Sequence, residues 1–129
     1  MQKITPTLIV NEVEPSVKFW IEKLGFEKPV EVPGDDGKLV FAMLVKGDVE
    51  VHLQSLESVK KDMPYLASCQ LPSASYLYID VEDVKFLYEK LKDCDIVTPL
   101  EKTFYGATHF FIREPGGHIL GFSQNESSK

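Results

Sequence analysis

Histidine and tyrosine side chains on two segments are the best candidates for chemistry in this sequence. In segment 48–54 apolar and polar residues alternate, which predicts a strand with one polar face that carries Glu50, His52 and Gln54. An imidazole beside a carboxylate can hydrogen-bond a ligand or move a proton. Phenol rings such as those of Tyr76 and Tyr78 can hold an aromatic group or a cation. Strand alternation predicts that one set of residues shares the face opposite the helices: Thr5, Thr7, Ile9, Glu50, His52, Gln54, Tyr76 and Tyr78.

Each of these candidates has two interpretations. His52 is either a hydrogen-bond partner or weak base for a ligand, or an ordinary polar residue of a strand. Tyr76 and Tyr78 either line a cleft or pack with their hydroxyls at the surface. Trp20 is expected in the core, because it lies on the apolar stripe of a predicted helix.

The spacing of the remaining reactive residues excludes several classes of site. The chain has no phosphate-binding loop or dinucleotide fingerprint, and Gly116-Gly117 belongs to a predicted hairpin turn. No order of Ser, Cys, His and acidic residues indicates a nucleophilic relay. Cys69 and Cys94 lack ligand or redox spacing, so we expect reduced thiols in a cytoplasmic protein.

Composition is typical of a single globular domain. The chain has 129 residues, 43% hydrophobic and 26% charged, with a net charge of -6 that favours a cationic ligand over nucleic acid. The longest apolar run, 39–45, is too short to cross a membrane. The first residues carry no signal-peptide pattern. We therefore expect a cytoplasmic chain that does not bind nucleic acid or membranes.

The sequence contains an internal duplication that must position these residues. Segments 17–24 and 84–91 are identical at six of eight positions, and the preceding apolar segments 8–11 and 77–80 also match. Each copy predicts a βαβββ module, so the fold class is α+β. The predicted helices run from Glu14 to a stop at Gly25 and over 83–92; the predicted strands cover 5–10, 39–45, 48–54, 75–79, 107–113 and 118–124.

The boundaries of the two modules follow from the segment between them. Residues 57–73 show no periodicity and contain two prolines, which predicts a linker. The modules then cover about 1–56 and 74–125 of one domain spanning 1–129. One strand in each module cannot be placed from the sequence.

Local motifs resemble the glyoxalase/bleomycin resistance protein/dioxygenase superfamily, which has the vicinal oxygen chelate fold. The matching segments are LIVN at 8–11, SVKFW at 16–20, LGF at 24–26, YG at 105–106 and FIREPGGH at 111–118. The resemblance implies a curved mixed sheet, or half-barrel, with the helices on its outer face. It also implies a homodimer and a ligand cleft, with Tyr105 as an aromatic wall.

Metal-using members of this superfamily take ligands from four positions, and these correspond here to Thr5, His52, Ala74 and Gly121. The pairs are equally spaced in the sequence, which supports the assignment. Alanine and glycine have no donor atom, and a threonine hydroxyl is a poor ligand for Ni, Zn or Fe(II). We therefore expect no metal and no other cofactor.

The resemblance favours a protein that binds a cationic or aromatic small molecule without transforming it. The expected ligand-binding residues are His52, Glu50, Tyr76, Tyr78, Tyr105, His109 and Phe111. The sequence does not fix which way the strand 107–113 turns His109 and Phe111. Two alternatives remain open: a metal-dependent lyase or dioxygenase with rearranged ligands, and a non-catalytic interaction module.

Overall fold

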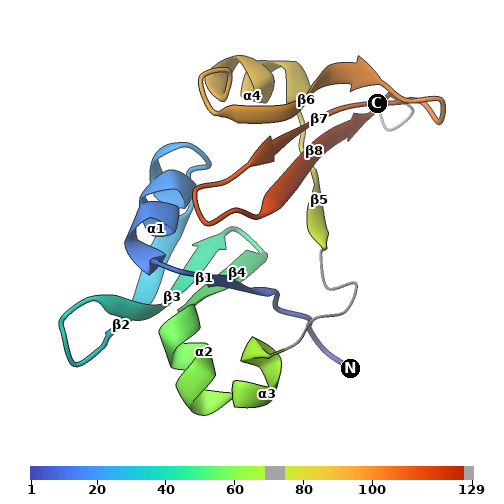
Figure 1. Cartoon of the computed structure of the whole chain (residues 1–129). Helices are drawn as coiled ribbons and strands as arrows, with labels where there is room; N and C mark the ends of the chain where they lie inside the picture. The colour runs from blue at the N-terminus through green and yellow to red at the C-terminus, as the bar shows by residue number, and fades with distance from the viewer. Residues whose placement is uncertain (69–74, 127–129) are drawn as a thin grey trace. The chain divides into compact units, whose positions relative to one another are not determined.

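The chain folds as two compact units, Met1–Ser73 and Ala74–Lys129. A computed structural model describes residues 1–68 and 75–126. Each unit holds one four-stranded mixed sheet and a helix between its first two strands, which confirms the α+β class and the duplicated βαβββ order (Figure 1). None of the helices in the described ranges has the length and apolar character needed to span a bilayer.

The first unit is a sheet with the strand order β1-β4-β3-β2. β1 pairs with β4 in parallel, and the other pairs are antiparallel. Its elements are β1 (Thr7–Val10), α1 (Val13–Glu22), β2 (Glu27–Pro33), β3 (Leu39–Lys46) and β4 (Val49–Ser55). β1 and β4 are parallel because of the path of the chain between them. The chain returns through α1 and then passes through the antiparallel strands β2 and β3, so it enters β4 in the direction of β1.

Helix α1 covers one face of this sheet with the apolar stripe seen in the sequence. Trp20 is fully buried and contacts Phe26 edge to face, with ring centroids 4.9 Å apart. Val51 and Leu53 of β4 are buried as well, whereas Glu50 and His52 alternate with them and stay partly accessible. The predicted core position of Trp20 and the predicted alternation of β4 are therefore confirmed.

The second unit repeats this plan with the strand order β5-β8-β7-β6. Its elements are β5 (Tyr76–Asp80), α4 (Val84–Lys90), β6 (Asp95–Lys102), β7 (Ala107–Arg113) and β8 (Ile119–Asn125). The Asp83 side chain caps α4 by accepting a hydrogen bond from the Phe86 amide at 3.0 Å. Tyr88 of α4 packs on Phe110 of β7 at a centroid distance of 5.0 Å, so this helix covers the face that holds Phe110 and Ile112.

Strands β2 and β6 are the two that the sequence left unplaced. Both lie at a sheet edge, where a proline costs no ladder hydrogen bond. Pro29 and Pro33 fall in β2, Pro99 falls in β6, and both pairings contain register shifts. These prolines and bulges interrupt the alternation by which a strand is recognised in sequence.

The described part of the predicted linker 57–73 contains two short helices, which the sequence analysis did not predict. These are α2 (Leu56–Asp62) and α3 (Pro64–Ala67). α2 begins at a cap in which the Ser55 hydroxyl accepts from the Ser58 amide at 3.2 Å. Helices this short carry too few residues for a periodic pattern. The candidate positions Cys69 and Ala74 lie outside the described residues.

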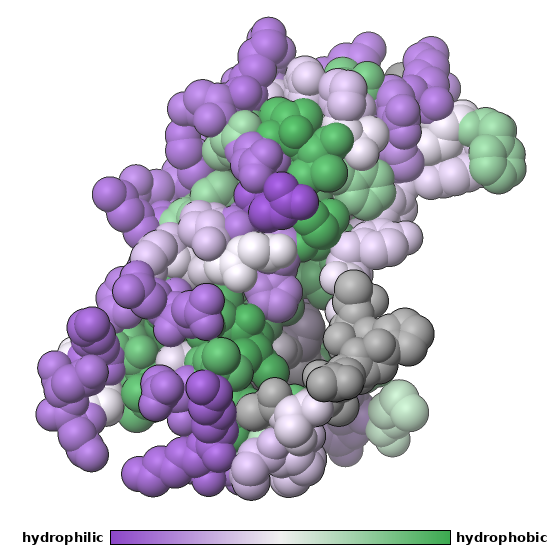
Figure 2. All heavy atoms as spheres, in the orientation of Figure 1, coloured by the Kyte–Doolittle hydropathy of each residue, from purple (hydrophilic) through white to green (hydrophobic). Residues whose placement is uncertain are grey.

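Hydrophilic side chains cover most of the periphery of the face seen in Figure 2, and apolar side chains show between them. This distribution agrees with a chain in which charged residues make up 26% of the sequence. The apolar core of each unit lies between its helix and its sheet.

Two buried serines allow a direct test of the fold. The Ser16 hydroxyl in α1 is buried without a hydrogen-bond partner in the described chain, whereas the hydroxyl of Ser55, which is also a buried residue, caps α2. We expect Ser16→Ala to leave the free energy of unfolding unchanged or to raise it by about 1 kcal/mol. Ser55→Ala should lower it by about 1 kcal/mol. Urea denaturation measures both, and an equal loss in the two variants would contradict the assignment.

Candidate functional site

The seven residues singled out from the sequence fall into two groups, one in each unit. Glu50 and His52 lie on β4 of the first sheet. The other five lie in the second unit, on β5, on β7 and in the turn between β6 and β7: Tyr76, Tyr78, Tyr105, His109 and Phe111. Each group is built on the sheet face opposite its helix.

The first group is an internally satisfied set of charges. Nε2 of His52 lies 2.5 Å from Oε2 of Glu50, and the Lys3 ammonium donates to Oε1 of the same carboxylate. The hydrogen bond from Lys3, and then the one from His52, hold the pKa of Glu50 below its usual value. Phe41 packs edge to face on the His52 ring, with centroids 5.1 Å apart. The partners of both side chains are therefore largely supplied by the protein itself.

The second group is a cluster of rings that we call the aromatic face: Tyr76, Tyr78, Tyr105, His109 and Phe111. The orientation of β7, which the sequence left open, turns His109 and Phe111 toward the two tyrosines of β5. Ring centroids lie 5.7 Å apart for Tyr76–Phe111, 6.0 Å for Tyr78–Phe111 and 5.9 Å for Tyr78–His109. These spacings fall within the range for favourable aromatic contacts.

The aromatic face depends on small residues in β8, the strand between β5 and β7. Gly121 is opposite Tyr78 on one side and opposite Phe111 on the other. A Cβ atom at this glycine would lie 2.5 Å from Cε2 of Phe111. Ser123 is opposite His109 in the same way. Because β8 has no large side chain at these positions, residues of β5 and β7 touch across it.

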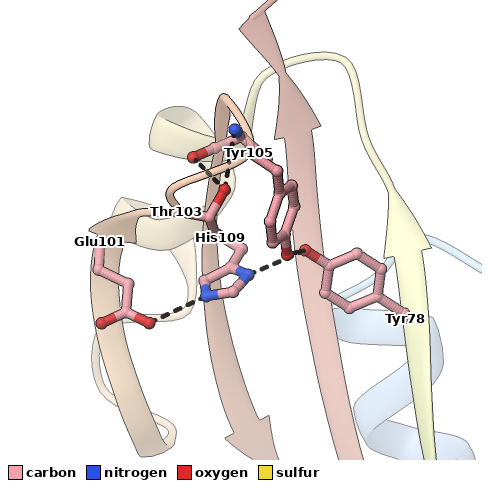
Figure 3. A network of polar contacts seen from close by, with 6 residues as sticks. Tyr78, Glu101, Thr103, Tyr105 and His109 are labelled. Atoms are coloured by element: carbon pink, nitrogen blue, oxygen red, sulfur yellow. Dashed lines mark hydrogen bonds and ion pairs between the residues drawn. The ribbon is translucent and has the colours of Figure 1, made fainter.

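A chain of polar contacts runs along the same face (Figure 3). Oε2 of Glu101 lies 3.0 Å from Nε2 of His109, and Nδ1 of His109 lies 2.9 Å from the Tyr78 hydroxyl. The Tyr78 and Tyr105 hydroxyls are 2.9 Å apart. The chain thus links β6, β7, β5 and the β6–β7 turn. We call it the relay: Glu101, His109, Tyr78 and Tyr105.

Glu101 was missed by the sequence analysis. It lies on β6, the strand that could not be placed, and its pairing with His109 follows a register shift. If the sequence had allowed β6 to be placed, its register would have shown that the Glu101 carboxylate lies beside His109, the one histidine of β7.

The outer end of the relay carries a neutral phenol. The hydrogen bond to Tyr78, together with partial desolvation, raises the pKa of Tyr105 above its ordinary value, and the nearby Thr103 hydroxyl acts weakly in the opposite direction. The Tyr105 ring is 54% exposed and the His109 ring is buried. The arrangement therefore presents rings and hydroxyls outward and keeps the His109 imidazole on the inside, while the Glu101 carboxylate is half exposed.

Comparison with known protein families identifies the superfamily of this chain. The model of the Glyoxalase/Bleomycin resistance protein/Dioxygenase superfamily matches residues 3–122. The chain belongs to this superfamily. The bleomycin resistance protein of Geobacillus stearothermophilus is 26% identical over 138 residues, which cover 99% of this chain and all of that protein.

Solved structures agree on the fold of this superfamily member. TioX from Micromonospora sp. ML1 has a TM-score of 0.75 at 21% identity, covering 97% of this chain and 99% of that one. A bleomycin-binding protein from Streptomyces verticillus, solved with copper(II)-bleomycin, has a TM-score of 0.64 at 24% identity, covering 98% of each chain. Such distant likenesses establish the fold and leave the ligand to be argued from this chain.

The metal positions of the superfamily do not hold a suitable donor set in this chain. Thr5 precedes β1, Gly121 has no side chain and is covered by the ring cluster, and His52 already binds Glu50. Ala74 lies outside the described residues and has no donor atom. Within 1–68 and 75–126, no three His, Cys, Asp or Glu side chains gather closely enough to hold a metal ion. The residues present do not fit a catalytic divalent metal.

The strand pairing also changes which residues of the first unit correspond to which residues of the second. β1 pairs with β4 through Leu8 and Leu53, and β5 pairs with β8 through Leu77 and Leu120. The first strands of the two units are thus 69 residues apart and the last strands 67 apart. The equal spacing that the sequence suggested for both ligand pairs is not kept, because the insertions differ between the copies.

Replacing Gly121 tests the packing of the aromatic face. Gly121→Ala should lower the free energy of unfolding by about 1–3 kcal/mol, because the added methyl group overlaps the Phe111 ring. In a Phe111→Ala background the same change should cost much less. Urea denaturation of the four proteins gives the coupling energy. Additive effects of the two substitutions would contradict this packing.

Removing Lys3 tests the charge set of the first unit. Lys3→Met should raise the pKa of Glu50 toward its ordinary value, which a carboxyl NMR titration measures. Because the folded-state pKa is lowered, the contribution of Glu50 to stability is present above the ordinary carboxyl pKa and is lost as pH falls through the folded value. Lys92→Met, at an exposed pair with Glu89, is the control and should leave the Glu50 titration unchanged.

Proposed function

We propose that this chain is a small-molecule-binding protein of the bleomycin-resistance type, which holds a cationic or aromatic ligand on the aromatic face without transforming it. The observation that carries the proposal is the accessibility of this cluster: Tyr76 is 61% exposed, Tyr78 is 43% exposed and Tyr105 is 54% exposed. Rings gathered on one sheet face and left accessible are unusual for a surface without a binding role.

The chemistry of the aromatic face favours a planar, positively charged ligand. Ring faces attract a cation with about 0.5–2 kcal/mol each and offer rigid apolar contact at little entropic cost. Glu101 adds a carboxylate that is half exposed at the edge of the cluster. The net charge of -6 adds a general attraction for cations.

The relatives support a binding function. Proteins named for binding or resisting bleomycin match this chain over nearly its whole length. Under this proposal His52 and Glu50 are structural, since they bind each other. The proposal makes no use of a metal.

We further propose that the protein acts as a homodimer in the cytoplasm. One sheet face provides one wall for a ligand, and a second copy of the chain would supply an opposing wall by two-fold symmetry. The cysteines lack the spacing of a disulfide pair or metal site, which suits a reducing compartment.

Titration calorimetry with bleomycin tests this function. We expect saturable binding by the metal-depleted protein, and Tyr76→Leu should weaken it about three- to tenfold because one ring of the face is lost. Phe86→Leu is the matched control: this ring is 70% exposed on α4, on the helix side of the same unit, and its loss should have no effect.

Three results would contradict the proposal. These are no binding up to millimolar ligand, an equal loss in Tyr76→Leu and Phe86→Leu, and binding that depends on a stoichiometric transition metal. The last would favour a metal-dependent lyase or dioxygenase with rearranged ligands.

A further inference from the structure

We propose that the relay makes the aromatic face selective for ammonium ligands that carry N–H groups, and that protonation of His109 removes this selectivity. This inference rests on the proposed function, because it names the ligand chemistry and the regulation of the same surface. Its basis is the unbroken sequence of contacts from Glu101 through His109 and Tyr78 to Tyr105 (Figure 3).

With a neutral His109, the direction of every hydrogen bond is determined. The Glu101 carboxylate can only accept, so Nε2 of His109 carries the proton and donates to it. Nδ1 of His109 is then an acceptor, and the Tyr78 hydroxyl donates to it. The Tyr105 hydroxyl in turn donates to the Tyr78 oxygen. The Tyr105 oxygen, on a residue that is 54% exposed, keeps an accepting lone pair beside the Thr103 hydroxyl.

With a protonated His109, Nε2 still donates to Glu101, and only the contacts beyond Nδ1 change. Nδ1 now carries a proton and donates to the Tyr78 oxygen, which leaves the Tyr78 hydroxyl free to donate to Tyr105. The Tyr105 hydroxyl is released to donate outward. One proton taken up inside the sheet therefore converts the exposed phenol from an acceptor into a donor, with no change in the position of any ring.

The acidic side chains around His109 also favour binding of a cation while His109 is neutral. Glu101 of β6 faces His109 directly, and Tyr78 of β5 and Tyr105 of the turn face it from the other side. Asp80 is exposed on β5 and is paired with Ser123, the residue of β8 opposite His109, so it belongs to the same sheet face. The carboxylates of Glu101 and Asp80 attract a cation while His109 is neutral. The positive charge of a protonated His109 offsets one of these two negative charges.

The consequence is a distinction between two kinds of cation. A protonated primary amine can donate an N–H group to the Tyr105 oxygen and also lie over the rings. A quaternary ammonium ion has no N–H group, so it uses the rings alone. A hydrogen bond to a charged donor at this site predicts a preference of about fivefold for the primary amine.

A matched pair of probes tests this distinction: phenethylammonium and its N,N,N-trimethyl derivative. Dissociation constants are measured by NMR titration of the protein with each probe from pH 8.5 to pH 5.5, a range in which both probes stay cationic. We expect the primary ammonium to bind about fivefold more tightly at the high end. This ratio should fall to about one at the low end.

Three variants locate the effect. Tyr105→Phe keeps the ring and removes the outer oxygen, so the ratio should be about one at every pH. His109→Gln removes the imidazole and should abolish the pH dependence of the ratio. Glu101→Gln, at an exposed position, serves if His109→Gln folds poorly: it removes the acceptor that fixes the proton on Nε2 of His109, so the ratio at pH 8.5 should fall toward one. His118→Gln lies in the turn before β8 and serves as the control, with an unchanged ratio and pH dependence.

The outcomes separate this inference from the proposed function. Equal affinities of the two probes at all pH values, a pH dependence that persists in His109→Gln, or an unchanged ratio at pH 8.5 in Glu101→Gln would overturn the inference while leaving the binding function intact. Failure of both probes and of bleomycin to bind would overturn the proposed function itself.

Discussion

Gly121 stands at the centre of β8, and the absence of a side chain there allows the rings of β5 and β7 to meet. Tyr78 and Phe111 are both opposite this glycine, and a Cβ atom would overlap the Phe111 ring. The rest of the candidate site depends on this close approach. If the rings were kept apart, Tyr78 would not reach His109 across the strand, and the path from Glu101 to the exposed Tyr105 would be broken.

The two units share one fold but carry different side chains on the sheet face opposite the helix. In the first unit the open face has a lysine, a carboxylate and an imidazole that satisfy one another. In the second the corresponding face is dominated by rings, and its charges lie along one side. Charges that are already paired have little free energy left to offer a ligand, whereas accessible rings retain theirs. This contrast is why we assign binding to the second unit.

Much of the fold followed from the sequence because helix and strand periods were strong where the core is formed. The stripe around Trp20 and the alternation around His52 predict most of the buried residues that they contain, but Ile21 and Val49 of the same patterns are 38% and 50% exposed. The edge strands β2 and β6 and the short helices after Ser55 were missed, since prolines and brevity remove periodicity. The ring cluster was predicted in composition, but Glu101 was not, because a partner on an unplaced strand is invisible without register.

The edge strands have a further consequence for the behaviour of the chain at high concentration. β2 and β6 carry prolines and register shifts, so their outward edges offer a broken row of amide and carbonyl groups. Such edges are poor templates for another strand, which protects against runaway polymerisation into cross-β fibres. Two copies that met at β2 or β6 would therefore join through side chains rather than by extending a sheet.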